Sequence, residues 1–221
     1  MKDCLHSYMK VGIVHFMAFS ATDLDGIRKI AEDEFFGGIE ITSVPGESRA
    51  DIAKLLESSK LTVGYCAQPV QLAEKVDINS LDTGQRKAAI SRMKAAIDEA
   101  YFLGASKFAM LSGPAPAADK CSEAKELLTD SLIQICDYAK SKGDLGIVME
   151  IFDRKYDKKC LIGPTEEGVE VAAAVRKQHP GFGLMVDLSH LPLLGESSDY
   201  ALKTAKNYLT HVHMGNCIMK D

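Results

Sequence analysis

The sequence has no closely spaced cysteine pair and no long apolar run, and each absence excludes a class of protein. Its six cysteines form no CxxC motif, which is typical of a reducing cytosol, where cysteine serves as a small buried apolar residue. No stretch approaches the roughly 18 apolar residues of a membrane span. The opening segment MKDCLHSYMK lacks the apolar stretch of a signal peptide. We therefore expect a cytoplasmic protein without a membrane partner.

An excess of basic residues is also lacking. The 221 residues include 26 Lys and Arg against 31 Asp and Glu, for a formal net charge of −5. Binding to a nucleic-acid backbone needs clustered Lys and Arg, so we expect no nucleic-acid partner. Apolar residues make up 46% of the chain, as in ordinary globular proteins. We expect residues 1–221 to form one domain with a substantial core.

Short apolar runs alternate along the chain with longer segments of helical period. Because these runs are continuously apolar, they are typical of parallel strands that are covered on both faces. The predicted strands are 11–19, 38–42, 61–66, 107–112, 146–152, 183–188 and 210–214. Amphipathic helices are predicted at 83–103 and 119–141, among others. Thr83 is a candidate N-cap for the first of these helices, and Gly104 stands where a C-terminal glycine is expected.

Strands that are each followed by a helix indicate an α/β fold with a parallel sheet. We expect a (β/α)8 barrel, or TIM barrel, whose eighth βα unit is missing from this sequence, because the chain stops shortly after the seventh strand. An open edge there would leave backbone groups unpaired beside the first strand. The alternative is an open doubly wound sheet, but neither GxGxxG nor GxxxxGK[ST] marks a nucleotide-binding turn.

Polar residues inside three consecutive apolar runs predict a metal site. Glu150, Asp187 and His213 each lie near the carboxyl end of a predicted strand, where barrel enzymes place their active sites. A buried charge is costly unless it is paired or bound to a metal. A single strand-end acid is more simply explained as a helix cap, but three such residues favour a shared site. Two carboxylates and one imidazole suit one divalent cation, such as Mn²⁺, Mg²⁺, Co²⁺ or Zn²⁺.

Two further histidines lie beside these predicted ligands. His190 follows Asp187 by three residues in the motif DLSH. It either faces the same cavity and hydrogen-bonds a substrate oxygen, or is a loop histidine bonded to a backbone carbonyl. His211 lies two residues before His213 and shares its side of the strand. We expect His211 to support the site rather than to bind the ion.

Three more polar residues are candidates for contact with a substrate. His15 in the first strand and Glu40 in the second either line the substrate pocket or are satisfied polar groups of the core. Arg154 follows Glu150 by four residues. It either fixes a carboxylate or hydroxyl of the ligand or belongs to a surface loop.

The segments VMEIFDR, VDLSH and HVHMGN together resemble the xylose isomerase-like barrel superfamily. This grouping holds sugar phosphate isomerases/epimerases, ketose 3-epimerases, inosose dehydratases and barrel-type AP-endonucleases. The resemblance covers most of the chain and implies that Glu150, Asp187 and His213 bind the metal and that His190 contacts substrate. In the epimerases, a Glu of strand eight is a fourth ligand and forms an acid/base pair with the strand-five Glu. No residue of this sequence takes that place, so we expect the eighth unit to lie outside it or the polypeptide to be inactive.

The resemblance implies a divalent-metal-dependent isomerase or epimerase of a sugar, polyol or similar hydroxy-ketone. Glu150 would move a proton to and from carbon through an enediolate, and His190 would support the oxygen on which charge develops. A metal-dependent dehydratase of the inosose or dehydroshikimate type needs almost the same site and is the alternative. A non-catalytic sugar-binding module is the second alternative. Members of the superfamily are often dimers or tetramers, which leaves a homo-oligomer open.

An AP-endonuclease is disfavoured within the same superfamily. Its metal cluster needs extra histidines on the second and third strands, where this sequence offers Glu40 and Cys66. The acidic net charge also disfavours DNA as a partner.

Overall fold

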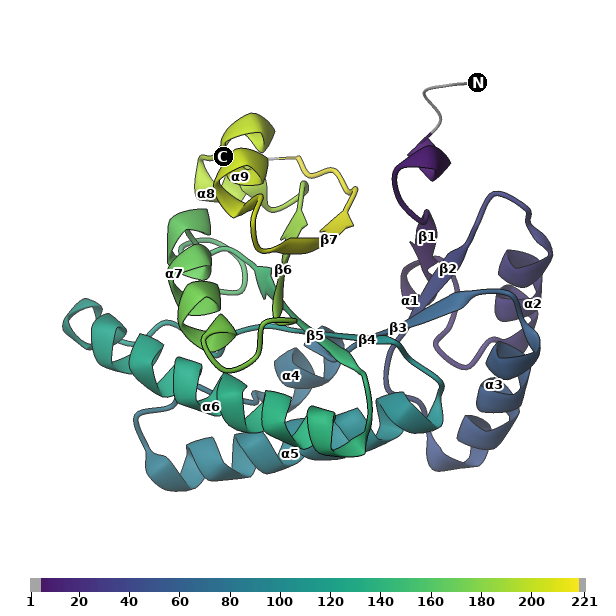
Figure 1. The fold of residues 1–221 in the computed structure, drawn as a ribbon, viewed down its shortest axis with the longest axis horizontal. Coiled ribbons are helices and arrows are strands. Elements are labelled where there is room, and N and C mark those ends of the chain that lie inside the picture. The colour runs from purple at the N-terminus through teal and green to yellow at the C-terminus, as the bar shows by residue number, and fades with distance from the viewer. Residues whose placement is uncertain (1–4, 219–221) are drawn as a thin grey trace.

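The chain forms a curled sheet of parallel strands whose outer side is wrapped by helices (Figure 1). A computed structural model describes residues 5–218. In this part of the chain the sheet has seven strands in sequential order, and every neighbouring pair is parallel. The strands are β1 (Gly12–Val14), β2 (Gly38–Ile41), β3 (Thr62–Cys66), β4 (Lys107–Met110), β5 (Gly146–Ile151), β6 (Gly183–Asp187) and β7 (Leu209–His213).

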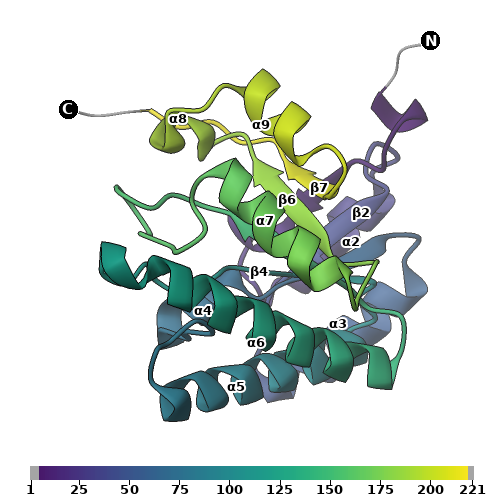
Figure 2. The same cartoon turned by 60° about the vertical axis from the view of Figure 1, so that its left-hand side comes forward.

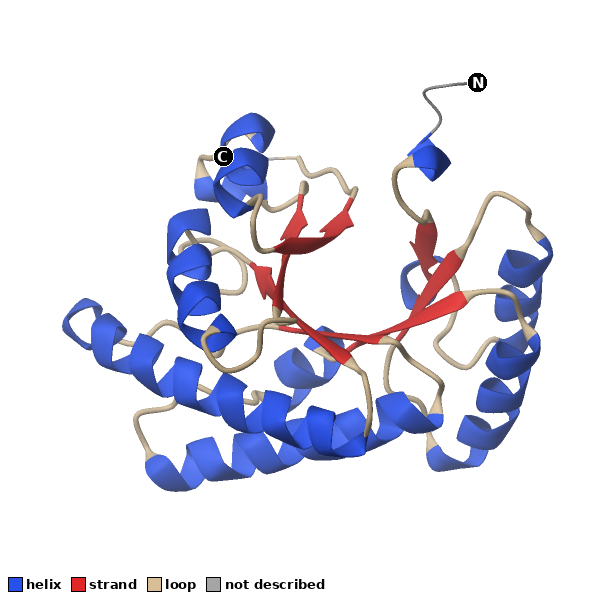
Figure 3. Cartoon of the chain, in the orientation of Figure 1, coloured by secondary structure: helices blue, strands red, loops and turns tan. Residues whose placement is uncertain are grey.

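The helices after β1 connect successive strands, and the long ones lie outside the arc that the strands describe (Figure 3). The helical elements are η1 (Leu5–Ser7), α1 (His15–Ala18), α2 (Leu24–Glu32), α3 (Gly46–Ser58), α4 (Gln68–Glu74), α5 (Thr83–Phe102), η2 (Ala118–Lys120), α6 (Cys121–Lys142), α7 (Thr165–Arg176), α8 (Leu191–Leu194) and α9 (Ser198–Ala205). Helices α5, α6 and α7 lie next to one another on the outer side of the sheet (Figure 2).

The sequential strand order confirms the predicted barrel topology, with one βα unit fewer than a TIM barrel among the described residues. A doubly wound sheet would reverse its strand order at a switch point, and β1 through β7 show no reversal. The strands β1 and β7 form the two edges of the curled sheet (Figure 1).

The main apolar core lies between the outer face of the sheet and the helices. Met93 and Ile97 of α5 are buried there, with Tyr65 of β3 and Phe108 of β4 stacked at 5.4 Å between ring centroids. The concave side of the sheet has a much smaller apolar cluster, formed by Ala109, Val148 and Met185. Most of the buried apolar surface, and so most of the hydrophobic stabilisation, lies between the sheet and the surrounding helices. The concave side of the sheet carries mainly polar residues.

Strand register places the predicted metal ligands on this concave face. Glu150 pairs with Met185 of the inner cluster, and Asp187 pairs with His213. Residues in register share a face of a sheet, as do residues two apart along one strand. Because Met185 and Asp187 are two residues apart, Glu150, Asp187 and His213 all face inward.

The first strand is shorter than predicted, so the placement of His15 in that strand is wrong. β1 ends at Val14, and His15 begins helix α1. Its imidazole is fully buried, with Nε2 3.1 Å from the carbonyl oxygen of Asp23. A Cβ at Gly26 would lie only 2.6 Å from the Phe19 ring, so this packing needs a glycine. The run 11–19 therefore spans a short strand and one turn of helix, and His15 is the buried residue of that turn.

The five described cysteines are free, and Cys66, Cys136 and Cys160 are buried, as expected of cysteines used as small apolar residues. Cys4 lies outside the described residues. Within residues 5–218, no helix combines the length and apolar character needed to cross a membrane.

Candidate metal centre

The carboxyl ends of β5, β6 and β7 bring Glu150, Asp187 and His213 together. One donor atom of each lies within 4.8 Å of the others. The Nδ1 atom of His213 is 3.7 Å from Oδ2 of Asp187, which is too long for a hydrogen bond. It suits two atoms that each bind a common cation at about 2.0–2.2 Å. Two carboxylates and an imidazole therefore fit a divalent cation in both chemistry and spacing.

The turn after β6 orients Asp187. Its Oδ1 accepts hydrogen bonds from the backbone N–H of Ser189 at 2.8 Å and from the Ser189 hydroxyl at 2.7 Å. The other oxygen, Oδ2, is thereby turned toward His213. Burial alone would raise the pKa of Asp187, but interactions with His213 and Ser189 outweigh it and lower the pKa to about 2. Asp187 is therefore a carboxylate at neutral pH, as a metal ligand must be.

Glu150 is the buried acid of the centre, with only 3% of its surface exposed. Burial raises its pKa to about 7, against the opposing effects of a hydrogen bond from Gln68 and of nearby His213. The Gln68 amide, at the start of α4, donates to Glu150 Oε2 at 3.0 Å. The carbonyl oxygen of the same amide is buried without a hydrogen-bond partner among the described protein atoms. The burial of this acceptor is therefore not compensated by a hydrogen bond from the described protein atoms.

Gln68 is a site residue that sequence reasoning missed. Its position could have indicated a role, because Gln68 follows the carboxyl end of the third strand and the predicted ligands also lie at the carboxyl ends of strands.

His190 reaches the centre from the N-terminus of α8. Its Nε2 lies 3.5 Å from both Glu150 Oε1 and Asp187 Oδ2, and its ring centroid lies 3.7 Å from that of Phe152. Burial lowers the pKa of His190, although Asp187 opposes the shift. The ring is therefore neutral at neutral pH and carries a single N–H donor. The structure brings His190 to the predicted ligands, and its contact with substrate stays a prediction.

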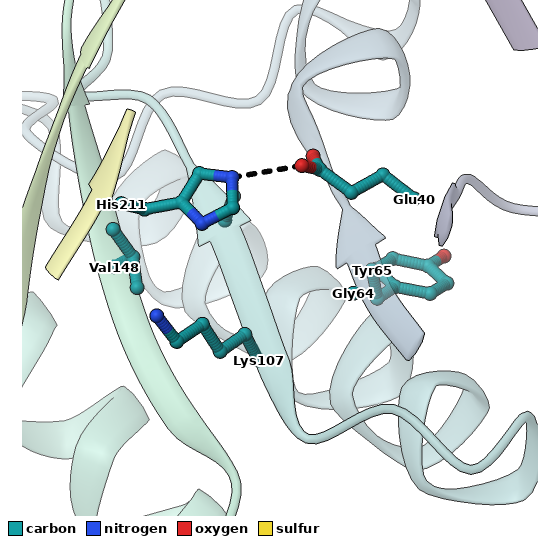
Figure 4. Close-up of a pocket in the computed structure, with 7 residues that line it drawn as sticks. Glu40, Gly64, Tyr65, Lys107, Val148 and His211 are labelled. Atoms are coloured by element: carbon teal, nitrogen blue, oxygen red, sulfur yellow. Dashed lines mark hydrogen bonds and ion pairs between the residues drawn. The ribbon is translucent and has the colours of Figure 1, made fainter. Parts of the chain in front are cut away.

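Glu40 of β2 faces the same space from the opposite side of the barrel. Its carboxylate lies 2.7 Å from Nε2 of His211 and 2.9 Å from Nε2 of His213. Glu40 and His211 point toward each other in Figure 4, with Lys107 of β4 nearby. Glu40, His211 and His213 also form a second cluster whose donor atoms lie within 4.8 Å. The barrel interior thus holds two adjoining polar clusters that share His213.

The two neighbouring carboxylates favour the protonated, charged form of His213. Burial favours neutral His213, but its interactions with Asp187 and Glu40 outweigh burial and raise its pKa to about 10. Burial likewise opposes ionisation of Glu40, yet hydrogen bonds from His211 and His213 hold its pKa well below the usual range. His213 thus lies between two carboxylates, with one ring nitrogen facing each.

Arg154 lies in a different environment. Its guanidinium binds both oxygens of Glu167 on α7 at 2.8 Å and also donates to the carbonyl oxygen of Leu161. These contacts tie the loop after β5 to the outer helix. Its contact with a substrate stays a prediction, as does that of His15.

A family model described as "Xylose isomerase-like TIM barrel" matches residues 18–217. Curated protein sequences give no match. A D-psicose 3-epimerase from Clostridium cellulolyticum H10, solved with D-tagatose, superposes with a TM-score of 0.76 at 20% identity, over 94% of this chain and 73% of that one.

Two further solved structures with the same fold carry other descriptions. The IOLI protein "with a binding zinc atom" has a TM-score of 0.71 at 19% identity, over 91% of this chain and 70% of that one. An AP endonuclease, family 2, from Brucella melitensis has a TM-score of 0.70 at 19% identity, over 86% and 72%. At these identities the structures establish the fold alone. With the family model covering nearly the whole sequence, the chain belongs to the xylose isomerase-like TIM barrel family.

Proposed function

We propose that this protein is a divalent-metal-dependent isomerase or epimerase of a ketose. The proposal is carried by the convergence of Glu150, Asp187 and His213 on the concave face. Glu150 is a buried carboxylate at this centre, and a carboxylate in such a position can serve as a general base. Solved structures of this fold include a D-psicose 3-epimerase and an L-ribulose 3-epimerase, which supports a ketose as the substrate class.

Glu150, Asp187 and His213 are the residues that would hold the ion, because their donor atoms fit it and lie close enough together. When bound, a divalent cation supplies a Lewis acid for the carbonyl and hydroxyl oxygens of the sugar. The IOLI protein, which shares this fold, is described with a binding zinc atom, and this supports a metal in the present protein. Loading the protein with Mn²⁺, Mg²⁺, Co²⁺ or Zn²⁺ in turn would identify the cation that supports activity.

The chemical step assigned to this chain is proton transfer at carbon. Glu150 removes the proton from the carbon beside the substrate carbonyl, and the C–H electron pair becomes a C=C bond while charge develops on the carbonyl oxygen. The N–H of neutral His190 stabilises that oxygen. Gln68 holds Glu150 Oε2, so Oε1, which faces His190, is left for the proton. Return of the proton by Glu150 to the neighbouring carbon isomerises the sugar. Epimerisation would also need an acid on the other face of the carbon, the place that a strand-eight Glu takes in the epimerases.

Solvent deuterium exchange tests this assignment. Metal-loaded protein is incubated in D₂O with D-psicose, D-tagatose, D-fructose or L-ribulose and their phosphates, and incorporation beside the carbonyl is followed by NMR. We expect exchange with at least one ketose, slowed by about 10²–10⁴-fold in Glu150→Gln, because the amide cannot accept the proton. Glu57→Gln, the same change at an exposed position of α3, is the matched control.

Two outcomes would contradict the proposal. Exchange that survives in Glu150→Gln would remove Glu150 as the base, and no exchange with any metal and ketose would favour a non-catalytic sugar-binding module. A dehydratase would instead release water from the same deprotonated substrate. The appearance of an unsaturated or deoxy product, rather than an epimer or isomer, distinguishes it.

A further inference from the structure

We propose that Glu40 is a positioning residue of the metal centre, which holds His213 with its Nδ1 lone pair turned toward Asp187 and Glu150. This inference rests on the proposed metal role of His213 and extends it to a strand on the other side of the barrel. From the sequence, Glu40 either lines the substrate pocket or is a satisfied polar group of the core. Its contacts favour a different task.

The carboxylate of Glu40 is already occupied by protein donors. Oε1 accepts from His211 Nε2 at 2.7 Å, and Oε2 lies 2.9 Å from both His213 Nε2 and Cys66 Sγ. An ionised carboxylate can only accept hydrogen bonds, so each histidine must carry a hydrogen on Nε2. In the neutral ring that binds a metal, the remaining nitrogen of His213 is then an unprotonated Nδ1.

Distances separate the two sides of the His213 ring. On the Nε2 side, the nitrogen lies 2.9 and 3.1 Å from the two oxygens of Glu40, which is hydrogen-bond length. On the Nδ1 side, Oδ2 of Asp187 is 3.7 Å away. An ion bound between two ligands holds them apart by about this much, whereas a hydrogen bond draws them closer. The ion therefore binds Nδ1 of His213, and Glu40 fixes the orientation of the ring by accepting a hydrogen bond from Nε2.

Neighbouring strands hold Glu40 in place for this role. The Glu40 side chain is 14% exposed, and its Cγ methylene lies over Gly64 of β3, where an added Cβ would come within 3.0 Å of Glu40 Cγ. His211 fixes the other oxygen and meets the His213 ring edge-on at 5.2 Å between centroids. Figure 4 shows Glu40 and His211 joined across the barrel interior. A carboxylate held by three donors has little freedom to turn toward a substrate.

Two other roles for Glu40 make different predictions. As a direct ligand it would share an ion with His211 and His213, whose donor atoms also cluster. That arrangement needs the metal on Nε2 of His213. As a substrate contact, Glu40 would affect the KM for the ketose and leave the affinity for the metal unchanged.

Nitrogen NMR of the wild-type protein distinguishes these roles without any substitution. In ¹⁵N-labelled protein loaded with Zn²⁺, long-range ¹H–¹⁵N spectra report which ring nitrogen of each histidine is protonated. We expect His213 to bind zinc through Nδ1 and to keep its hydrogen on Nε2, and His211 to keep its Nε2 hydrogen without binding zinc. Coordination through Nε2 of His213, or any coordination by His211, would overturn the proposal.

A substitution measures how much the support contributes. In Glu40→Gln the amide can accept from one histidine but presents an N–H₂ group to the other, so we expect a 10–100-fold weaker affinity for Zn²⁺ in competition with a chelator. The visible spectrum of the Co²⁺-loaded variant should keep the wild-type bands, since the ligands are the same. Glu57→Gln should bind both ions as wild type does.

The outcomes separate this proposal from the function on which it rests. Wild-type protein that binds neither Zn²⁺ nor Co²⁺ would overturn the metal centre and the role of Glu40 together. Wild-type binding with equal affinity in Glu40→Gln would overturn the positioning role alone. A changed Co²⁺ spectrum in the variant would show that Glu40 is itself a ligand, which also overturns it.

Discussion

Glu150 is almost completely buried, and within residues 5–218 one hydrogen bond reaches its carboxylate, from Gln68. Removing an acid from water disfavours its charged form, and one amide donor compensates only in part. The raised pKa of about 7 is the result. Ionisation of the buried Glu150 therefore lowers the free energy of unfolding, and a bound cation would offset this loss.

This cost predicts a pH-dependent stability in the presence of a chelator. The pKa of Glu150 rises from 4.5 to about 7 on folding, so its contribution to stability is complete below pH 4.5 and is lost as the pH rises through 7. Glutamine stays neutral and has no such dependence. We expect Glu150→Gln to gain on the order of 3 kcal/mol over wild type between pH 4.5 and pH 8, at 1.36 kcal/mol per pKa unit. Urea unfolding of both proteins at the two pH values measures this difference in the free energy of unfolding.

The comparison of the two proteins at each pH is its own control for the titratable groups that do not interact with Glu150. If the difference in unfolding free energy is the same at pH 4.5 and pH 8, Glu150 ionises as freely in the folded protein as in the unfolded chain.

Single residues were predictable from the sequence where they break a pattern. Glu150, Asp187 and His213 stood out because each interrupts an apolar run near the end of a strand, and the structure brings them together. Gln68 and Cys66 were missed because a glutamine beyond a strand and a cysteine within one look ordinary. Their significance appears only when β3 lies beside the strands that carry their partners, Glu150 and Glu40.

At the scale of elements, the helices show how local chemistry sets their boundaries. Helix α5 runs from Thr83 to Phe102, within one residue of its predicted span, and Gly104 follows it with a φ of +74° as expected of a C-terminal glycine. The cap at its start is different, since the side chain that accepts from the Gln85 N–H at 2.7 Å is Asp82. Thr83 was a plausible choice because threonine and aspartate are both good caps, and their order in the sequence cannot decide between adjacent positions.

The cap of α5 can be tested by stability. We expect Asp82→Ala to lower the free energy of unfolding by about 1 kcal/mol, because the first turn loses an acceptor for one of its free N–H groups. Thr83→Ala, at the neighbouring position, should change it much less, and Asp82→Asn should restore most of the loss. Denaturant unfolding of the three variants gives the comparison. A larger loss in Thr83→Ala than in Asp82→Ala would show that the helix begins with a different cap.

At the scale of the whole molecule, the order and direction of the strands followed from the alternation of apolar runs and helices. Each strand pairs with its neighbour in the sequence, so local connections determine most of the topology. What the sequence could not show is how tightly the sheet curls. That curvature decides whether Glu40 on β2 meets His211 and His213 on β7, because these contacts cross the barrel rather than follow the strand ladder.

Metal binding should therefore stabilise the molecule as a whole. A ligand that binds only the folded state at 100 times its Kd adds about 2.7 kcal/mol to stability. For a chain of this length that corresponds to a rise in Tm of about 5–10 °C. We expect this rise with Mn²⁺ or Zn²⁺ after chelator treatment, and its loss in Asp187→Asn, measured by thermal unfolding. An equal rise in the variant would place the stabilising ion elsewhere.

The contact between Glu40 and His213 joins residues 173 positions apart in the chain, whereas the strand ladder pairs neighbours. The entropy of closing a loop grows with its length, so contacts of high sequence separation form after the local ones have reduced the effective distance. The ligands Glu150, Asp187 and His213 lie on three neighbouring strands, but His213 meets Glu40 only when β2 and β7 have both docked. We therefore expect the full affinity for an ion, rather than the ability to bind one, to depend on contact between the first and last parts of the sheet.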